Sequence, residues 1–211
     1  NAYYQRIGEK RSGYDFGLQK SNPKSVKPDG THRFIHISDT HIYDSSRTAM
    51  DGHAASTKDI RDYVENEDIA FVIHTGDVSR EGFASYRDFM NNENMPMSQV
   101  FYCIGNHDLG SGKYGEESFE NHFGPAYYSF EVGNIHYIVT PMPGGDGRPD
   151  FTQERIGEWL KNDLKYLPEG KPVIAFNHSV MSGDGHFRFG NKETGFVDLS
   201  DYNLKAWLYG H

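Results

Sequence analysis

Acidic, amide and imidazole side chains recur in short clusters along this chain, each at the end of a run of apolar residues or at the end of the sequence. The clusters are Asp39-Thr40-His41, Gly76-Asp77, Gly105-Asn106-His107-Asp108, Asn177-His178 and Gly210-His211. Carboxylate oxygen, amide oxygen and imidazole nitrogen together suit divalent ions such as manganese, iron or zinc. Taken singly, each cluster is better explained by a turn or by an ordinary hydrogen-bonded polar residue. Their conjunction in one chain predicts a metal-dependent site.

The residues before the clusters predict the strands that position them. Short apolar runs rich in β-branched and aromatic residues span residues 33–38, 69–74, 99–104 and 172–176. Near-continuous apolar strands of this kind are usually buried on both faces of a sheet. Ligands of such sheets bind outside the carboxyl ends of the strands, so we expect the clusters to meet at one edge.

Helical patterns alternate with these strands and favour an α/β fold. They span residues 56–66, 83–91 and 152–166, with Ser56 and Thr152 as the expected N-terminal caps of the first and third. Residues 127–132 and 135–140, joined by Gly133-Asn134, predict a β-hairpin, which implies a mixed sheet.

Composition excludes several classes of protein. The chain has 211 residues, a net charge of -9 and a single cysteine, Cys103. One cysteine allows neither an internal disulfide framework nor a CxxC metal site. The acidic charge argues against a general nucleic-acid backbone binder, and no apolar run approaches the roughly 20 residues of a membrane span.

In their order along the chain, the clusters resemble the motifs of the calcineurin-like metallophosphoesterases. That family pattern is DxH, GDxxxxG, GNH(D/E), a single histidine and GHxH, and this chain has its counterparts at residues 39–41, 76–82, 105–108, 178 and 210–211. The second histidine of the last motif is absent, because the sequence stops at His211. We therefore expect a lead-in or linker over residues 1–31 and a catalytic domain over residues 32–211 that is incomplete at its C-terminus.

The resemblance implies a four-layer α/β/β/α fold with two mixed β-sheets, and two divalent metal ions (Mn, Fe or Zn) as cofactors. The implied metal ligands are Asp39, His41 and Asp77 for the first ion, and Asp77, Asn106, His178 and His211 for the second. Asp77 would bridge the ions, and a metal-bridging hydroxide would attack phosphorus in a small phosphorylated substrate. His107 would assist the leaving group, and Asp108 would orient His107.

Departures from the family pattern bear on the substrate. The second motif reads Gly-Asp-Val-Ser-Arg-Glu-Gly, which differs from the patterns of protein Ser/Thr phosphatases and purple acid phosphatases and leaves a broad bacterial-type metallophosphoesterase. Cations and histidines in the loops that rim the site are the candidate substrate contacts. They are Arg80, His53, Arg148, His186 and Arg188.

Three further expectations concern residues around the motifs. His36 and His74 lie inside predicted strands, where they would be hydrogen-bonded to neighbours or would support metal ligands. The glycine-rich segment 144–150 lacks EF-hand spacing and is expected to be a loop on the substrate side. Residues 14–18 are similar to the lead-in of exported multidomain members, which favours an extracytoplasmic or periplasmic location over a cytoplasmic one and flanking domains in a longer parent chain.

Two other functions remain open at the level of sequence. Without the last histidine, the chain could be a non-catalytic metal- or substrate-binding module. Some members of the family are nucleases or phosphodiesterases that act on nucleotides, although the charge of -9 counts against a nucleic acid as partner.

Overall fold

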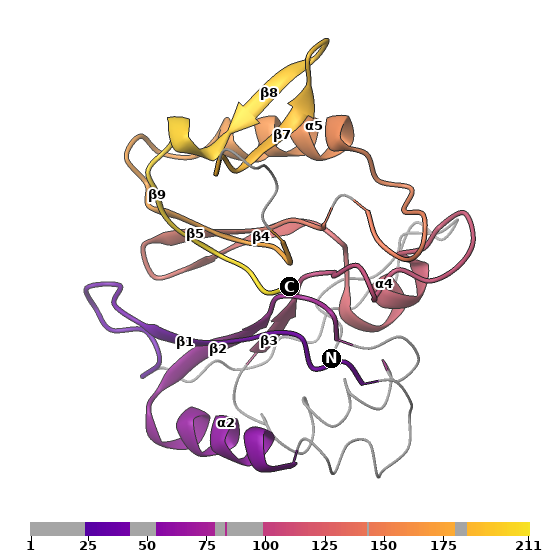
Figure 1. Cartoon of the computed structure of the whole chain (residues 1–211). Helices are drawn as coiled ribbons and strands as arrows, with labels where there is room; N and C mark the ends of the chain where they lie inside the picture. The colour runs from indigo at the N-terminus through magenta and orange to yellow at the C-terminus, as the bar shows by residue number, and fades with distance from the viewer. Residues whose placement is uncertain (1–23, 43–53, 79–82, 84–98, 143, 180–184) are drawn as a thin grey trace, which may run out of the picture.

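A computed structural model describes residues 24–42, 54–78, 83, 99–142, 144–179 and 185–211 (Figure 1). The first sheet has the order β1-β2-β3, and its strands β1 (Arg33–Ile37), β2 (Ile69–His74) and β3 (Gln99–Tyr102) all run parallel. The second sheet has the order β4-β5-β6-β9, with β4 (Tyr128–Val132), β5 (Ile135–Val139), β6 (Val173–Phe176) and β9 (Leu204–Leu208). β4 is antiparallel to β5 and the other pairs are parallel, so this sheet is mixed.

Helices cover the outer sides of the two sheets. α2 (Ala54–Asn66) lies against the first sheet, and α5 (Gln153–Leu164) lies against the second together with the hairpin of β7 (Arg188–Asn191) and β8 (Gly195–Asp198) (Figure 1). The shorter α4 (Glu117–Phe123) and the 3-10 helix η2 (Leu199–Asp201) complete the described elements. The expected α/β fold of packed sheets between helices is confirmed. In the described part of the chain, however, only the second sheet is mixed.

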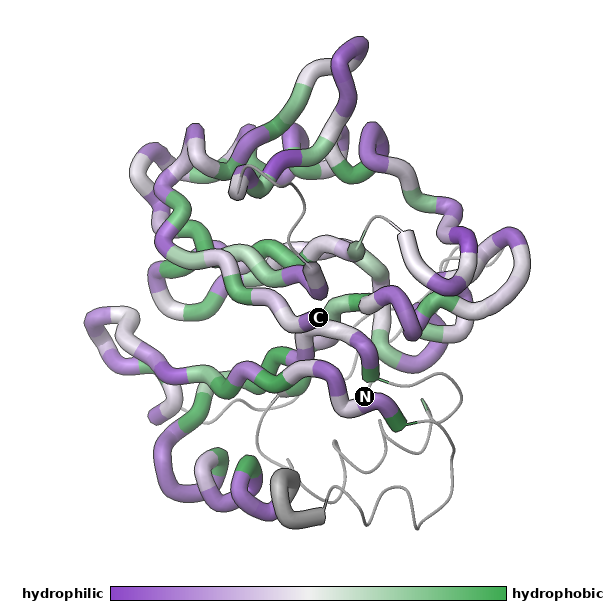
Figure 2. The backbone as a smooth tube through the Cα atoms, in the orientation of Figure 1, coloured by the Kyte–Doolittle hydropathy of each residue, from purple (hydrophilic) through white to green (hydrophobic). Residues whose placement is uncertain are grey.

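Aromatic side chains fill the space between the two sheets. Phe71 of β2 packs on Tyr137 of β5 with their ring centroids 5.0 Å apart, and Phe101 stacks on Phe130 at 3.8 Å. Figure 2 shows hydrophobic stretches along the strands in the middle of the molecule and hydrophilic ones along its outer turns. Each large ring buries much apolar area, so this aromatic layer stabilises the packing of one sheet against the other.

Most of the predicted elements are present, with small shifts at their ends. The four predicted strands correspond to β1, β2, β3 and β6, and the predicted hairpin to β4 and β5. The Thr152 side chain caps α5 by accepting a hydrogen bond from the Arg155 N–H. The prediction of Ser56 as a cap is wrong, because α2 begins at Ala54 and Ser56 lies within its first turn.

Other predictions fall partly or wholly beyond the described residues. The predicted helix over residues 83–91 is described only at Phe83, which is helical and buried. Of the lead-in, residues 24–31 form a turn beside the β4–β5 hairpin, where the Asn134 side chain donates to the Asp29 carbonyl at 3.1 Å. Among the helices described here, none has the length and apolar character needed to cross a membrane.

Candidate metal centre

The loops that follow β1 and β2 are joined by backbone hydrogen bonds. The N–H groups of Asp39 and His41 donate to the carbonyls of Gly76 and Asp77, both at 3.0 Å. Asp39, His41 and Asp77 all have φ between 48° and 57°, a left-handed conformation that costs roughly 1–3 kcal/mol for a residue with a side chain and that concentrates at functional sites. The joined loops hold these three side chains at the carboxyl edge of the first sheet.

The loop after β3 is hydrogen-bonded to the loop after β2 through Asp77 and Asp108. The Asp77 carboxylate accepts from the His107 N–H at 2.9 Å. The Asp108 carboxylate accepts from the Gly105 N–H and the Val78 N–H, both at 2.8 Å. A Cβ at Gly105 would overlap Asp77, so only glycine allows this approach.

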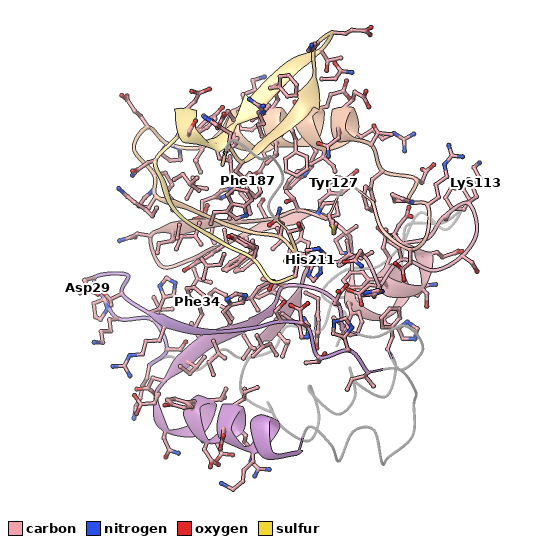
Figure 3. All side chains as sticks on the ribbon, in the orientation of Figure 1. Asp29, Phe34, Lys113, Tyr127, Phe187 and His211 are labelled. Carbon is pink, nitrogen blue, oxygen red and sulfur yellow. The ribbon has the colours of Figure 1, made fainter. Side chains whose placement is uncertain are left out.

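The second sheet reaches the site through its own strand ends. Nδ1 of His178, after β6, donates to the Thr75 carbonyl at 2.8 Å, which directs the lone pair of the neutral ring to Nε2. The N–H of His211, after β9, donates to the Asp39 carboxylate at 3.0 Å. Figure 3 shows His211 where the two sheets meet. The site is therefore built from both sheets.

Two groups of donor atoms result, and Asp77 belongs to both. The donor atoms of His41, Asp77 and His107 lie within 4.8 Å of one another, and so do those of Asp77, His178 and His211. The Asp77 carboxylate lies 3.1 Å from Nε2 of His178 and 3.7 Å from Nε2 of His41. These side chains lie close enough together to be candidate ligands of a metal ion.

The remaining two predicted ligands border these groups. Asp39 Oδ1 lies 3.8 Å from Nε2 of His41 and 4.0 Å from Nε2 of His178. The side-chain oxygen of Asn106, in the loop after β3, is buried without a hydrogen-bond partner. An orphaned buried oxygen costs roughly 1–3 kcal/mol, which a cation would offset. The carboxylates, imidazoles and amide oxygen present here fit a divalent metal.

The electrostatics of the site favour positive charge beside Asp77. Burial disfavours a charged His178 ring, but the hydrogen bond and charge of the Asp77 carboxylate raise the pKa of His178. Burial would likewise raise the pKa of Asp77, but hydrogen bonds from His178 and from the His107 N–H lower it. His178 and Asp77 thus each favour the charged form of the other, so positive charge is stabilised beside the Asp77 carboxylate.

His74 is a buried residue that holds two of the loops together. Burial lowers the pKa of His74 to about 3, so its ring is neutral. Nδ1 accepts from the Gly76 N–H at 3.2 Å, and Nε2 pairs with the Thr40 hydroxyl at 3.0 Å, which donates to the Val78 carbonyl. The expectation of a hydrogen-bonded histidine in the sheet is therefore met, and its partners lie between the predicted ligands.

His36 is hydrogen-bonded in a similar way. Its Nε2 pairs with the Thr75 hydroxyl at 2.8 Å, and burial lowers the pKa of its ring. The Thr75 carbonyl also accepts from His178, so His36 and His178 both bind Thr75 at the end of β2.

The expected role of Asp108 needs correction. We expect from the sequence that Asp108 orients His107, but its two oxygens accept from the backbone of Gly105 and Val78. The carboxylate bound to the His107 ring is that of Asp146, whose Oδ2 lies 2.8 Å from Nδ1. The sequence signal for Asp146 is the glycine-rich segment in which it stands, Gly144-Gly145-Asp146-Gly147.

Three of the five predicted substrate contacts lie among the described residues. Arg148 is exposed, two residues beyond Asp146 on the same loop, and its carbonyl accepts from the Gly115 N–H. His186 pairs with Asp198 at 2.7 Å, and the Arg188 guanidinium lies over the Phe196 ring.

Both of those residues belong to the β7–β8 region, which lies beside α5 on the outer side of the second sheet (Figure 1). The described partners of His186 and Arg188, Asp198 and Phe196, thus lie in this region, and a contact of either residue with substrate stays a prediction. The other two predicted contacts, His53 and Arg80, lie outside the described residues.

Comparison with known proteins agrees with this arrangement. The family model of the calcineurin-like phosphoesterases matches residues 32–211. The chain is 26% identical over 202 residues to the uncharacterised protein YvnB of Bacillus subtilis, and the match covers 85% of this chain and 15% of YvnB. It is 22% identical over 185 residues to a 3′,5′-cyclic-nucleotide phosphodiesterase of Nostoc sp., covering 83% of this chain and 69% of that protein.

The family match takes in all five clusters from which the site is built, and the relatives match most of the same chain. The sequence motifs, the joined strand ends and the comparisons thus agree. The chain belongs to the calcineurin-like phosphoesterases, a family of metal-dependent enzymes.

Proposed function

We propose that this chain hydrolyses phosphate esters with two divalent metal ions that share Asp77. The observation that carries the proposal is the membership of Asp77 in both groups of donor atoms. The proposed ligands are Asp39, His41, Asp77, Asn106, His178 and His211. When bound, such ions supply Lewis-acid stabilisation of the phosphoryl oxygens and lower the pKa of water.

The protein's own groups supply orientation in this proposal. His178 is fixed by its bond to the Thr75 carbonyl, and His107 by its bonds to Asp77 and Asp146. The His107 and His41 rings lie 5.3 Å apart between centroids, and His107 belongs to the first group of donor atoms, but we assign its ring to the substrate and not to an ion. A phosphate ester bound at these groups would have the His107 ring within reach of its leaving oxygen.

Replacing Asp77 tests the proposal. Metal-based stabilisation of the transition state is worth several kcal/mol, so Asp77→Asn should lower the metal-dependent kcat/KM for p-nitrophenyl phosphate or bis(p-nitrophenyl) phosphate by about a hundredfold or more. Asp62→Asn is a matched control, because Asp62 is a carboxylate on α2 that pairs with Lys58. Unchanged hydrolysis by Asp77→Asn would rule the proposal out. Metal binding without any hydrolysis would favour a non-catalytic binding module.

A phosphodiester of a nucleotide is the second candidate substrate. It is motivated by the Nostoc relative, whose name describes a 3′,5′-cyclic-nucleotide phosphodiesterase. A panel of nucleoside monophosphates and 3′,5′-cyclic nucleotides, assayed with manganese, iron or zinc, separates monoester from diester cleavage. Faster cleavage of the cyclic compounds would favour the diester, and cleavage of the monophosphates alone would exclude it.

The domain boundary near residue 31, the flanking domains and the extracytoplasmic location stay predictions. The chain spans about 15% of the length of YvnB and 69% of the Nostoc protein. The family match starts at residue 32, which is consistent with a catalytic domain over residues 32–211.

A further inference from the structure

Asp146 approaches the site from a loop that the family motifs do not include. Its Oδ2 lies 2.8 Å from Nδ1 of His107, and 39 positions in the sequence separate the two residues. An ionised carboxylate can only accept a hydrogen bond, so Nδ1 of His107 is the donor. The proton of the neutral ring is then on Nδ1, and its lone pair is on Nε2.

The backbone of this loop packs directly against the loop that carries His107. The Asp146 N–H donates to the Asn106 carbonyl at 3.0 Å. A Cβ at Gly145 would come 2.5 Å from the same carbonyl oxygen, and a Cβ at Gly147 would overlap the carbonyl oxygen of Gly110. The glycines on both sides of Asp146 thus permit a contact between backbones that places its carboxylate on the ring.

We propose that Asp146 is the positioning residue that fixes the His107 ring with Nε2 toward the leaving oxygen of the ester. This inference rests on the proposed function, in which His107 assists that oxygen. In the step, water forms the new P–O bond and releases a proton to solvent. The P–O bond to the leaving group breaks, and the leaving oxygen keeps the electron pair and takes a proton from Nε2 of the His107 imidazolium. The neutral ring keeps the proton on Nδ1, which stays hydrogen-bonded to Asp146, and Nε2 regains its proton from solvent.

The dependence of rate on leaving group tests this role. Asp146→Asn has nearly the same shape but removes the charge and can present an N–H to Nδ1. Loss of such a supporting partner typically costs 10–100-fold. We expect a loss of kcat of about that size for phenyl phosphate, whose leaving oxygen needs a proton. The loss should be much smaller for 2,4-dinitrophenyl phosphate, with little change in KM.

Two further variants separate positioning from a general loss of structure. Asp150→Asn changes another carboxylate of the same segment, one that pairs with Arg155 at 2.9 Å, and should leave the ratio of the two rates unchanged. Gly147→Ala keeps the Asp146 carboxylate but displaces its loop, and should reproduce the leaving-group effect of Asp146→Asn. Equal losses for both esters, or none, in Asp146→Asn would overturn the proposal.

A measurement on the ring itself is independent of activity. The ¹⁵N shifts of the His107 ring, recorded on the full chain as purified and after treatment with EDTA, and assigned with His107→Gln, report which nitrogen carries the proton. We expect the Nδ1–H form in the wild type and a changed distribution in Asp146→Asn. An Nε2–H ring in the wild type, or shifts that Asp146→Asn leaves unchanged, would refute the role of Asp146. If the wild type hydrolyses neither ester, the proposed function is wrong, and the ring shifts still decide whether Asp146 fixes His107.

Discussion

At the scale of single residues, the site contains polar atoms that the protein itself leaves unsatisfied. Asn106 is the sharpest example, because its buried side-chain oxygen has no hydrogen-bond partner although the loop around it is tightly bonded. Buried amide oxygens are nearly always paired in folded proteins. The exception is explained if this oxygen is kept for a cation.

Removal of the Asn106 side chain should therefore weaken metal binding and leave the fold intact. Loss of an outer partner of a metal ligand typically costs 10–100-fold in affinity, and we expect Asn106→Ala, which removes a proposed direct ligand, to cost at least about as much. The measurement is the metal concentration that gives half-maximal phosphatase activity, together with the melting temperature of the metal-free protein.

Asn203→Ala serves as the matched amide removal. The Asn203 side chain donates to the Gly170 carbonyl at 2.7 Å, away from the ligand groups. An equal metal requirement in Asn106→Ala and the wild type would show that Asn106 is not a ligand.

At the scale of elements, an ionic network around the buried His136 links β4, β5 and α5. His136 of β5 bonds through Nδ1 to Glu131 of β4 at 2.7 Å and through Nε2 to Asp163 of α5 at 2.8 Å. Asp163 also accepts from the Ser129 hydroxyl, and Lys171 pairs with Glu131. The network ties the hairpin to the helix that covers it.

The pH dependence of stability should report this network. Burial disfavours charge on His136, but the Asp163 and Glu131 carboxylates outweigh it and raise the pKa of His136 above 6.5. The folded protein therefore holds the proton more tightly than the unfolded chain. The protonated His136 therefore contributes stability that is fully present below pH 6.5 and is lost as the pH rises through the raised pKa.

Urea unfolding of the wild type and His136→Gln over this range measures the effect. The wild type should exceed the variant most in free energy of unfolding at the acid end, and the difference should shrink with rising pH. His122→Gln, a histidine of α4 outside the network, is the control. A difference that grows with pH would contradict the assignment.

At the scale of the whole molecule, the candidate metal site lies where the two sheets join. Its proposed ligands come from loops of both sheets, and the N–H of His211 (Figure 3), after the second sheet's β9, donates to Asp39, after the first sheet's β1. An ion bound by both sheets would connect the two halves of the fold in addition to the aromatic layer between them. Ligands that bind only the native state stabilise it by mass action.

Chelation should consequently lower the melting temperature. An ion present at 100 times its Kd adds about 2.7 kcal/mol, which corresponds to roughly 5–10 °C in a chain of this size. Thermal melts with and without EDTA test this for the wild type, with Asp77→Asn as the variant in which EDTA should have little effect. A wild-type melting temperature that EDTA does not change would mean that bound metal does not join the sheets.

Elements with a strong local pattern could be predicted, whereas others depend on their neighbours. β2 is an unbroken apolar run, and α5 has Ile156, Leu160 and Leu164 at helical spacing, all buried. β7 and β8 are short, and β7 contains a buried glycine, Gly190, that packs beside Gly157 of α5. No periodicity reveals such strands, because pairing and packing against the helix create them.

The sequence alone picked out the candidate site residues, because most of their clusters follow local apolar runs that form strands and strand ends gather ligands; the resemblance to the family motifs supplied their expected roles. The tertiary structure decided which carboxylate forms a hydrogen bond with the His107 ring. Asp108 is its neighbour in the chain, but backbone N–H groups occupy its oxygens, and Asp146 reaches the ring across 39 positions. It also paired His186 with Asp198 and set Arg188 over Phe196, on a hairpin packed against α5. Contacts between segments that are distant in sequence depend on how the layers pack, and no local spacing encodes them.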